Sequence, residues 1–537
     1  MSAKLHEWAS AQLSALNVPV TRLVTDSRAV RRGDTFVAYP GEKTDGRQYI
    51  AAAIAQGASA VIWEARHFTW NPAWRVPNFA VTDLRGKAGW LADAAYGAPS
   101  QKLWVVGVTG TNGKTSTCHW IARALSENGC TRGSPAADCR LDDATGKAKR
   151  CALIGTLGNG FVDGLQPTEN TTPDAVRVHG LLAEYLREGA GAVAMEVSSH
   201  ALAQGRVNGV QFDVAMLTNL SRDHLDYHGD MQSYAATKRK LFDWQNLGYV
   251  VLNLDDPYGV ELAEQLQDAA ASPRDGVAEV IGYGLSDAAL LLAERLGLRM
   301  VYGNLLEMTG QGLRLAVHSS WGAAELNSTL VGRFNAANLL GALAVLLVSG
   351  MALNDAAEAL GRARPVAGRM QRLGSTDEPT VIVDYAHTPD ALEKVLQALR
   401  EISSVTGGKL FCVFGCGGNR DRGKRPMMGT VAEKFSDFCI VTSDNPRSEN
   451  PREIIAEIVG GMDSDNHEII VDRAIAIESA IRYARQRDTV LIAGKGHETY
   501  QEIDGVKYPF DDLEVAQRAL QSSRGLRQER DKLRGGQ

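Results

Sequence analysis

One glycine-rich segment carries the residue types that bind a polyphosphate. It reads Gly107-Val-Thr-Gly-Thr-Asn-Gly-Lys-Thr-Ser116, follows an apolar run and precedes an amphipathic one. Such a loop points backbone N–H groups and a helix N-terminus at phosphate, while Lys114 adds a positive charge and the Thr115 hydroxyl can reach Mg²⁺. The strict Walker pattern needs a glycine where the chain has Val108, so the segment is a variant with glycines at 107, 110 and 113. A plain glycine turn between a strand and a helix is the alternative.

Carboxylate and imidazole side chains follow two later apolar runs. Glu196 stands in Met195-Glu-Val-Ser-Ser-His200, and the second group is Asn219-Leu-Ser-Arg-Asp-His-Leu-Asp-Tyr-His228. At the strand ends of one parallel sheet, these side chains can reach the phosphates and a metal ion. The pair His224 and His228 could instead bind zinc from a helix, although no third ligand stands at zinc spacing. Each histidine alone is also compatible with a hydrogen-bonded structural role.

Short β-branched runs alternate with helical patterns, which is typical of parallel sheets covered by helices. We predict a first domain over 1–100, a central domain over 101–345 and a third domain over 346–537. Strands are expected at 35–38, 60–63, 79–81, 103–109, 192–197, 212–218, 250–252, 380–383, 410–414, 438–442 and 489–493. A buried helix is expected from Asn335 to Ser349. The last four strands predict a doubly wound sheet that binds ligands at the carboxyl ends of its strands.

Composition narrows the class of protein. The chain has 537 residues, 44% hydrophobic and 22% charged, with a net charge of -6, which excludes a wholly disordered or membrane-embedded chain and makes nucleic acid an unexpected partner. Seven cysteines without a CxxC pair indicate reduced thiols, and the first ten residues contain no apolar signal core. We therefore expect a cytoplasmic protein without a membrane span. Residues 131–150 lack apolar periodicity and are predicted to be a mobile surface insertion.

Nine segments together carry a resemblance to a known family. In chain order they read GVTGTNGKTS, ENTTPD, MEVSSHAL, TNLSRDHLDYHG, GRFNAANLLGAL, VDYAHTPDAL, GCGGNRDRGKRP, SDNPRSENP and AGKGHE. This set resembles the Mur ligase family over nearly the whole chain, from Thr25 to about Asp512. The resemblance implies an α/β fold of three domains, with a central P-loop ATPase-like parallel sheet and a C-terminal doubly wound, Rossmann-like sheet.

The resemblance also implies a reaction, an ATP-dependent amide ligation in peptidoglycan precursor synthesis, on which cell shape and division depend. It is strongest to members that add meso-diaminopimelate to UDP-N-acetylmuramoyl-L-alanyl-D-glutamate through an acyl phosphate. Lys114, Glu196, His224 and Lys238 are the implied catalytic residues. Magnesium is the implied metal, held by Thr115, Glu196, His224 and a carbamate on Lys238. Without the family, Lys238 would be one of several solvated lysines on a helix.

Three groups of binding residues follow from the same resemblance. The ATP group is Gly110, Thr111, Asn112, Gly113, Lys114, Thr115, Ser116, Asn335, Asn338 and Asp384. The UDP-muropeptide group is Ser27, Asn170, Thr171, Thr172, Ser198, Gln204 and Arg206. The diaminopimelate group is Arg420, Asp444, Asn445, Pro446, Arg447, Gly494 and Glu498. An arginine suits the distal carboxylate that separates diaminopimelate from lysine, because a guanidinium binds a carboxylate through two hydrogen bonds.

Rival functions stay open at this point. A folylpolyglutamate synthetase would share the phosphate loop and the ligation, but it would not explain the DNPR segment at 444–447 or the first domain. A P-loop motor or switch would hydrolyse the nucleotide without forming an amide. A catalytically inactive structural protein is disfavoured because the four implied catalytic residues are all present. We expect a monomer acting on small molecules.

Overall fold

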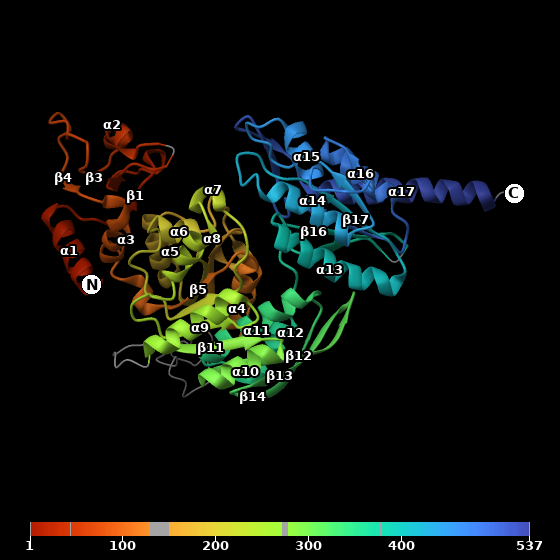
Figure 1. The fold of residues 1–537 in the computed structure, drawn as a ribbon. Helices are drawn as coiled ribbons and strands as arrows, with labels where there is room; N and C mark the ends of the chain where they lie inside the picture. Colours follow the sequence, from red (N-terminus) through yellow and green to blue (C-terminus); the bar gives the residue numbers. More distant parts are fainter. Residues whose placement is uncertain (1, 43, 129–149, 271–277, 376, 536–537) are drawn as a thin grey trace.

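The computed structural model describes residues 2–42, 44–128, 150–270, 278–375 and 377–535. Figure 1 shows the N-terminal and C-terminal parts of the chain at opposite ends, with the central part between them. The predicted insertion at 131–150 lies outside the described residues except for Arg150, which begins a strand. Within the described ranges, no helix is both long and apolar enough to cross a membrane. Cys118, Cys151, Cys412, Cys416 and Cys439 are free thiols.

The first part of the chain forms a parallel sheet in the order β1-β2-β3-β4. Its strands are β1 (Leu23–Val24), β2 (Thr35–Ala38), β3 (Ala60–Glu64) and β4 (Asn78–Val81). Helix α1 (Ser2–Ala15) packs on α3 (Leu84–Ala95), and α2 (Ile50–Ala55) lies beside β2. The three strands predicted here are confirmed to within one residue, because fully apolar runs between turn residues have few alternatives.

The central sheet has ten strands in the described part of the chain, in the order β14-β13-β12-β11-β10-β9-β5-β8-β6-β7. They are β5 (Trp104–Thr109), β6 (Arg150–Gly155), β7 (Gly158–Phe161), β8 (Ala190–Glu196), β9 (Val214–Leu217), β10 (Tyr249–Asn253), β11 (Glu279–Gly284), β12 (Arg299–Thr309), β13 (Gly312–Ser319) and β14 (Gly322–Ser328). The predicted strands β5, β8, β9 and β10 are confirmed. The sequence analysis missed the others. Antiparallel β12–β14 alternate buried with exposed residues, so they lack the continuous apolar run that marks a strand buried on both faces.

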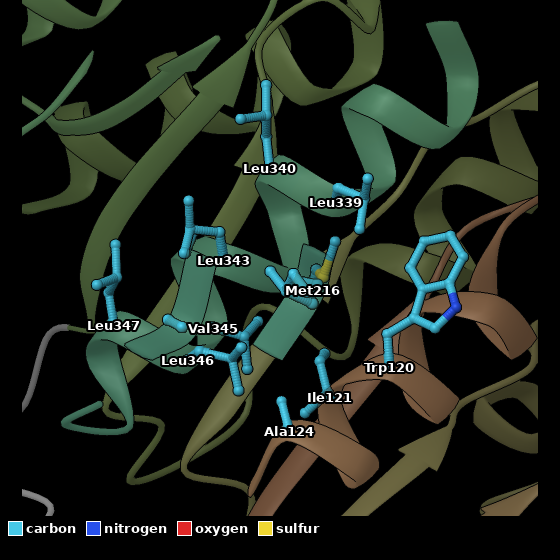
Figure 2. Close-up of a cluster of buried hydrophobic side chains, with 14 of the residues drawn as sticks. Trp120, Ile121, Ala124, Met216, Leu339, Leu340, Leu343, Val345, Leu346 and Leu347 are labelled. Atoms are coloured by element: carbon cyan, nitrogen blue, oxygen red, sulfur yellow. The ribbon is translucent and has the colours of Figure 1, made fainter. Parts of the chain in front are cut away.

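Helices surround this sheet. They are α4 (Lys114–Asn128), α5 (Ala175–Arg187), α6 (Ser199–Ala203), α7 (Leu225–His228), α8 (Met231–Arg239), α9 (Pro257–Ala270), α10 (Asp287–Leu296), α11 (Arg333–Val348) and α12 (Leu353–Gly361). The predicted buried helix is confirmed as α11, which is apolar on all sides and therefore lies in the core. Figure 2 shows Leu346 of α11 beside Ile121 and Ala124 of α4. This packing fixes the phosphate-loop helix α4 against α11.

The third sheet has the order β15-β16-β20-β17-β18-β19 and is parallel except for β15. Its strands are β15 (Gln371–Leu373), β16 (Thr380–Asp384), β17 (Leu410–Phe414), β18 (Phe438–Val441), β19 (His467–Ile469) and β20 (Thr489–Ala493), with a separate hairpin of β21 (Tyr500–Ile503) and β22 (Val506–Pro509). Helices α13 (Pro389–Thr406), α14 (Lys424–Phe435), α15 (Pro451–Val459), α16 (Arg473–Tyr483) and α17 (Asp512–Gly535) cover it. All four predicted strands are confirmed, and so is the α/β fold class.

Candidate active site

The predicted phosphate loop is a strand–loop–helix turn between β5 and α4. Gly110 has φ +145°, and a Cβ atom there would lie 1.9 Å from Thr218 Oγ1. Gly113 has φ +87°, and a Cβ atom there would lie 2.8 Å from the Asn338 side-chain amide. Only glycine accepts both the left-handed backbone and the close contact. The loop can therefore approach a ligand with its backbone, and it already touches α11.

Two ammonium groups meet at one carbonyl of this loop. Lys114 Nζ donates to Gly110 O at 2.9 Å and to Thr111 O at 2.8 Å, and Lys238 Nζ donates to the same Gly110 O at 2.8 Å. Burial lowers the pKa of Lys114, against the opposing effect of Glu196 and Asp223. Since one neutral carbonyl oxygen cannot balance two positive charges, this position favours an anion.

Lys238 is not the solvated helix lysine that its sequence neighbourhood suggests. It lies on α8 with 1% of its surface exposed, and its Nζ is 4.6 Å from the centroid of the Tyr234 ring. Burial, followed by the charge of Lys114, brings the pKa of Lys238 well below its ordinary value. A buried lysine of lowered pKa spends more time as a neutral, nucleophilic amine.

Glu196 connects the loop with the strand-end residues around it. Its Oε2 accepts hydrogen bonds from Thr115 Oγ1 at 2.9 Å and Thr156 Oγ1 at 3.1 Å, and its Oε1 accepts from Thr156 N at 2.7 Å. Its backbone oxygen accepts from Thr172 Oγ1 at 2.7 Å. The carboxylate is 1% exposed at the end of β8. Glu196 thus contacts both a residue of the predicted ATP group and one of the predicted muropeptide group.

His224 lies beside a carboxylate that the sequence analysis did not single out. Asp223 Oδ1 accepts from the His224 backbone N–H at 2.9 Å, and Asp223 Oδ2 lies 3.3 Å from His224 Nε2 and 3.5 Å from His387 Nε2. Burial alone would raise the pKa of Asp223, but the hydrogen bond from His387 and the nearby positive charges bring it well below its ordinary value. Burial lowers the pKa of His224 to about 3. The site therefore holds an ionised carboxylate beside a neutral imidazole.

His228, the second member of the alternative zinc pair, has a different partner. Its Nε2 lies 3.0 Å from Ser199 Oγ, and its ring centroid lies 5.1 Å from that of Tyr234. Burial lowers the pKa of His228 to about 4. His224 and His228 thus have different polar partners, Asp223 and Ser199, although both rings lie near that of His200, at 4.8 Å and 5.6 Å between centroids.

A cavity of about 740 Å³ opens beside the loop. Of the predicted ATP group it is lined by Thr111, Asn112, Gly113, Lys114, Thr115, Ser116, Asn335, Asn338 and Asp384, but not by Gly110. Asp384 Oδ2 accepts from Met370 N at 2.7 Å. Arg369 Nη2 lies 3.3 Å from Thr115 Oγ1, and its guanidinium lies 4.2 Å from the Tyr385 ring centroid. The third sheet thus closes a cavity that begins on the central one.

The predicted muropeptide residues form a second network on the central domain. Arg206 donates to Gln204 Oε1 at 2.8 Å and to Thr172 O at 2.9 Å, and Thr172 Oγ1 lies 3.4 Å from Ser198 Oγ. Gln204 also donates to Glu42 of the first domain. Thr171 Oγ1 accepts from Thr156 at 3.1 Å and lines the cavity.

Ser27 and Asn170 lie away from the hydrogen bonds of that network. Ser27 begins a short 3-10 turn in which Arg28 pairs with Asp26. Asp26 raises the pKa of Arg28, and Glu169, next to Asn170, adds to that rise.

The predicted amino-acid residues meet on the third domain. Asn445 Nδ2 donates to Glu498 Oε2 at 2.8 Å, and Lys495 Nζ donates to Asn445 Oδ1 at 3.1 Å. Gly494 has φ +118°, and a Cβ atom there would lie 2.6 Å from Asp444 Oδ2. Pro446 and Arg447 follow directly, so these residues form one polar patch.

Arg447 is held at this patch by its backbone and by its side chain. Its φ of 53° is unusual for arginine, and its N–H donates to Glu502 O at 3.0 Å while its carbonyl accepts from Asp504 N at 2.7 Å. Its Nη1 donates to Gly418 O at 2.8 Å, and its Nε lies 3.2 Å from Glu502 Oε2. Glu502 of β21 therefore pairs with this guanidinium.

Arg420 completes the set from a neighbouring loop. It is exposed, and its charge adds to the lowering of the pKa of His200 that burial and Arg206 cause. Arg420 also lines a groove together with Arg222, Leu225 and Asp226 of the central domain.

Three family models match the chain. They are the Mur ligase middle domain at residues 108–346, the Mur ligase glutamate ligase domain at 368–496 and the Mur ligase family catalytic domain at 19–96. A relative from Chromobacterium violaceum is 50% identical over 517 residues, covering 96% of this chain and 97% of its own. The chain belongs to the Mur ligase family.

Several relatives of this ligase carry one name. The proteins from Chromobacterium violaceum and from Pseudomonas aeruginosa, the latter 46% identical over 93% of this chain and 95% of its own, are each called UDP-N-acetylmuramoyl-L-alanyl-D-glutamate--2,6-diaminopimelate ligase. A solved structure of the same name is 34% identical, covers 94% of this chain and 96% of its own, and superposes with a TM-score of 0.61. A folylpolyglutamate synthase from Mycobacterium tuberculosis, 17% identical with a TM-score of 0.53, shares the fold, covering 76% of this chain and 92% of its own.

Sequence reasoning about this ligase missed four residues at the site, namely Asp223, His387, Lys495 and Glu502. The first three stand inside motifs that were already recognised, next to residues that were assigned. These three residues could have been predicted from the sequence, because each is an ionisable side chain that follows a strand. Glu502 had no comparable signal, because it reaches Arg447 from the hairpin strand β21, which the analysis did not predict.

Proposed function

We propose that this ligase joins meso-diaminopimelate to UDP-N-acetylmuramoyl-L-alanyl-D-glutamate with cleavage of ATP to ADP and phosphate. The position of Glu196 carries the proposal, because its carboxylate bonds Thr115 of the phosphate loop and its carbonyl bonds Thr172 of the muropeptide network. A nucleotide phosphate and the dipeptide carboxylate would therefore meet at the end of β8. The names of the relatives supply the substrate identities.

Lys114 and the loop amides would act in the first step, in which the D-glutamyl carboxylate attacks the γ-phosphate. Two anions must approach each other, so positive charge and N–H groups at the loop lower the barrier. Lys114 Nζ lies on Gly110 O and Thr111 O, where its charge can act on an incoming phosphate. Arg369 lies 3.3 Å from Thr115 and adds a second positive charge on the side of the third domain.

Magnesium fits the residues at this position. The buried Glu196 carboxylate and the Thr115 hydroxyl are oxygen donors suited to a hard divalent cation, and the neutral His224 imidazole is a softer third donor. When bound, the ion would neutralise the oxygens of the transferred phosphoryl group. The chain's own residues hold these donors in place, through Thr156 for Glu196 and through Asp223 for His224.

A carbamate on Lys238 also fits. The lysine is buried beside Lys114, which leaves two positive charges close together, and its pKa is well below the ordinary value. A neutral amine can add carbon dioxide, and the resulting carbamate carries a negative charge toward Lys114 and the metal region. The modification would therefore replace the repulsion between Lys238 and Lys114 by an attraction between the carbamate and Lys114.

The third-domain patch would then bind the amine substrate that attacks the acyl phosphate. Arg447 and Arg420 offer guanidinium groups for a carboxylate, while Asp444 and Glu498 offer carboxylates for an ammonium group. Diaminopimelate carries both charges at its distal carbon, whereas lysine carries only the ammonium group. The patch suits the former.

We further propose a monomer whose domain limits lie near residue 100 and after α12. Helix α12 packs against β14 and α4 of the central sheet, so the second limit fits better beyond Gly361 than at 345.

The test is direct. The purified full chain is incubated with ATP, Mg²⁺, the UDP-muramoyl dipeptide and either meso-diaminopimelate or L-lysine, and the UDP-tripeptide is measured by mass. We expect product with diaminopimelate, far less with lysine, and ADP release that requires both co-substrates. ADP release without either co-substrate, or product with lysine alone, would contradict the proposal.

A further inference from the structure

An ion pair joins the third domain to the central domain outside the nucleotide cavity. Arg222 Nε lies 2.9 Å from Asp421 Oδ2, and Arg222 Nη2 lies 3.1 Å from Asp421 Oδ1. The Asp421 side chain is 10% exposed and that of Arg222 is 38% exposed. Two parallel N–H···O bonds fix orientation as well as distance. The pair therefore fixes a loop of the third domain relative to the central domain.

The central-domain end of this pair is tied to the phosphate loop. Arg222 lies between β9 and α7, and its neighbour Ser221 exchanges two hydrogen bonds with Thr111, from Ser221 N to Thr111 Oγ1 at 3.0 Å and from Thr111 Oγ1 to Ser221 O at 3.1 Å. Asp223 and His224 follow at once. The guanidinium thus sits on a segment whose place is set by the nucleotide site.

The third-domain end belongs to the loop that carries Arg420. Asp421 Oδ1 also accepts from Gly423 N at 2.9 Å, so the carboxylate orders its own loop. A Cβ atom at Gly423 would lie 2.7 Å from Arg222 Nη2, which shows how closely this loop approaches the arginine. At the other end of the loop, a Cβ atom at Gly417 would lie 2.9 Å from Arg447 Nη1. The loop therefore connects the ion pair with both arginines of the amino-acid patch.

A groove of about 720 Å³ runs along this junction. Its lining includes Arg222, Leu225 and Asp226 from the central domain and Arg420, Asp421 and Arg422 from the third. Among the described residues Arg420 forms no ion pair, and its Nη1 donates to the adjacent Asn419 O at 3.4 Å. The direction in which the Arg420 guanidinium points thus depends on the position of the 417–423 loop.

We propose that Arg222 and Asp421 are positioning residues for the amino-acid substrate, holding the 417–423 loop so that Arg420 faces the attacking amine's distal carboxylate. The inference rests on the proposed function. An ordinary surface ion pair would contribute little, but this one is bidentate and has a nearly buried carboxylate. Its expected effect falls on the amino acid and not on ATP, because the ATP side has its own interdomain contact from Asn112 Nδ2 to Asp390 Oδ2 at 3.0 Å.

Steady-state kinetics with varied diaminopimelate and varied ATP test the proposal. We expect Arg222→Ala and Asp421→Ala each to raise KM for diaminopimelate about tenfold, which corresponds to about 1.4 kcal/mol. KM for ATP should stay within about twofold, and kcat at saturating diaminopimelate within about threefold, because the two residues act on binding geometry. The double variant should be no worse than either single one, since both remove the same contact.

The matched control is Arg314→Ala, which removes an exposed pair with Glu325 inside one domain. It should leave both KM values unchanged. Unchanged KM for diaminopimelate in the single variants, equal rises in both KM values, or additive effects in the double variant would overturn the proposal. Arg222→Lys keeps the charge and loses the second hydrogen bond. Its KM for diaminopimelate should lie between that of Arg222→Ala and that of the wild type.

Hydrogen–deuterium exchange separates this inference from the function it rests on. In the substrate-free full chain, amides of 417–423 should exchange faster in Arg222→Ala than in the wild type or in Arg314→Ala. If amides of 417–423 exchange faster in Arg222→Ala but the wild type forms no tripeptide, the proposed function is contradicted. The conclusion that the ion pair holds this loop would then still stand. If these amides exchange at the wild-type rate in Arg222→Ala while the wild type forms the tripeptide, only the positioning role of the ion pair is contradicted.

Discussion

The two ends of the active site balance charge in opposite ways. At the nucleotide end, Lys114 and Lys238 both donate to Gly110 O, and the nearest carboxylate, Glu196, is already bonded to threonines. At the amino-acid end, Arg447 pairs with Glu502 and Lys495 pairs with Glu498. The first end brings two buried lysines to one carbonyl oxygen, with Glu196 and Asp223 as opposing charges, while the second pairs Arg447 and Lys495 directly with carboxylates. Substitutions at the first should therefore affect rate, and those at the second should affect selectivity.

The largest expected effect comes from removing the loop cation. Lys114→Ala should lower kcat on the order of 10³-fold, because it deletes a charge that acts on the transferred phosphoryl group. The melting temperature should stay within a few degrees, since the glycines and α4 keep their packing. Lys434→Ala, at an exposed lysine on α14, is the control. Near-normal turnover of Lys114→Ala would contradict the expectation that substitutions at the nucleotide end affect the rate.

Lys238→Ala should lower kcat about 10²-fold and should leave the melting temperature unchanged or raise it. The buried ammonium lies beside Lys114 with only a carbonyl as its acceptor, and replacing a poorly compensated buried charge costs little stability. A small carboxylic acid added to the variant should restore part of the rate by standing in for the carbamate. Full activity of the variant without any addition would show that Lys238 has no role at the metal region.

A smaller effect is expected at Arg447, where selectivity should change more than rate. Arg447→Ala should narrow the ratio of kcat/KM for diaminopimelate to that for lysine about tenfold, close to 1.4 kcal/mol. The value stays modest because Glu502 already pairs with the guanidinium when no ligand is bound. Glu502→Gln frees that guanidinium and should widen the same ratio. An unchanged ratio in both variants would exclude Arg447 from amino-acid choice.

The last effect concerns the pH dependence of stability and falls on the nucleotide end, where His119 lies on α4. Burial, helped by the charge of Arg369, lowers the pKa of His119 on α4 to about 4, and its Nε2 is buried without a hydrogen-bond partner. The unfolded chain binds a proton at this residue below its ordinary pKa near 6.5, while the folded chain does so only near 4. Stability is therefore lost as pH falls from about 6.5 toward 4, by about 2 kcal/mol at pH 5.

His119→Asn should reduce this acid sensitivity. The measurement is the free energy of unfolding in urea at pH 7 and at pH 5, with His318→Asn, at an exposed position on β13, as the matched control. If the free energy of unfolding falls by the same amount from pH 7 to pH 5 in the wild type and in His119→Asn, His119 is not the source of the acid sensitivity.

Local sequence was sufficient for the phosphate loop. The loop from Gly107 to Ser116 is continuous, so glycine spacing, the preceding apolar run and the lysine determine its shape without help from distant residues. The same holds for the buried strands β5, β17 and β20, whose apolar runs have no alternative place in a folded domain. Antiparallel β12–β14 and the β21–β22 hairpin were missed because their exposed faces break that pattern.

The sequence by itself determined the α/β class, the phosphate loop and the family, because each depends on residue order within short segments. Only the tertiary structure decided the environment of Lys238, the pairing of Arg447 with Glu502 and the contact of Arg222 with Asp421. Lys238 and Gly110 are 128 residues apart, and Arg222 and Asp421 are 199 apart. Burial, pKa and ion pairing depend on which surfaces meet in space, and spacing along the chain does not specify that.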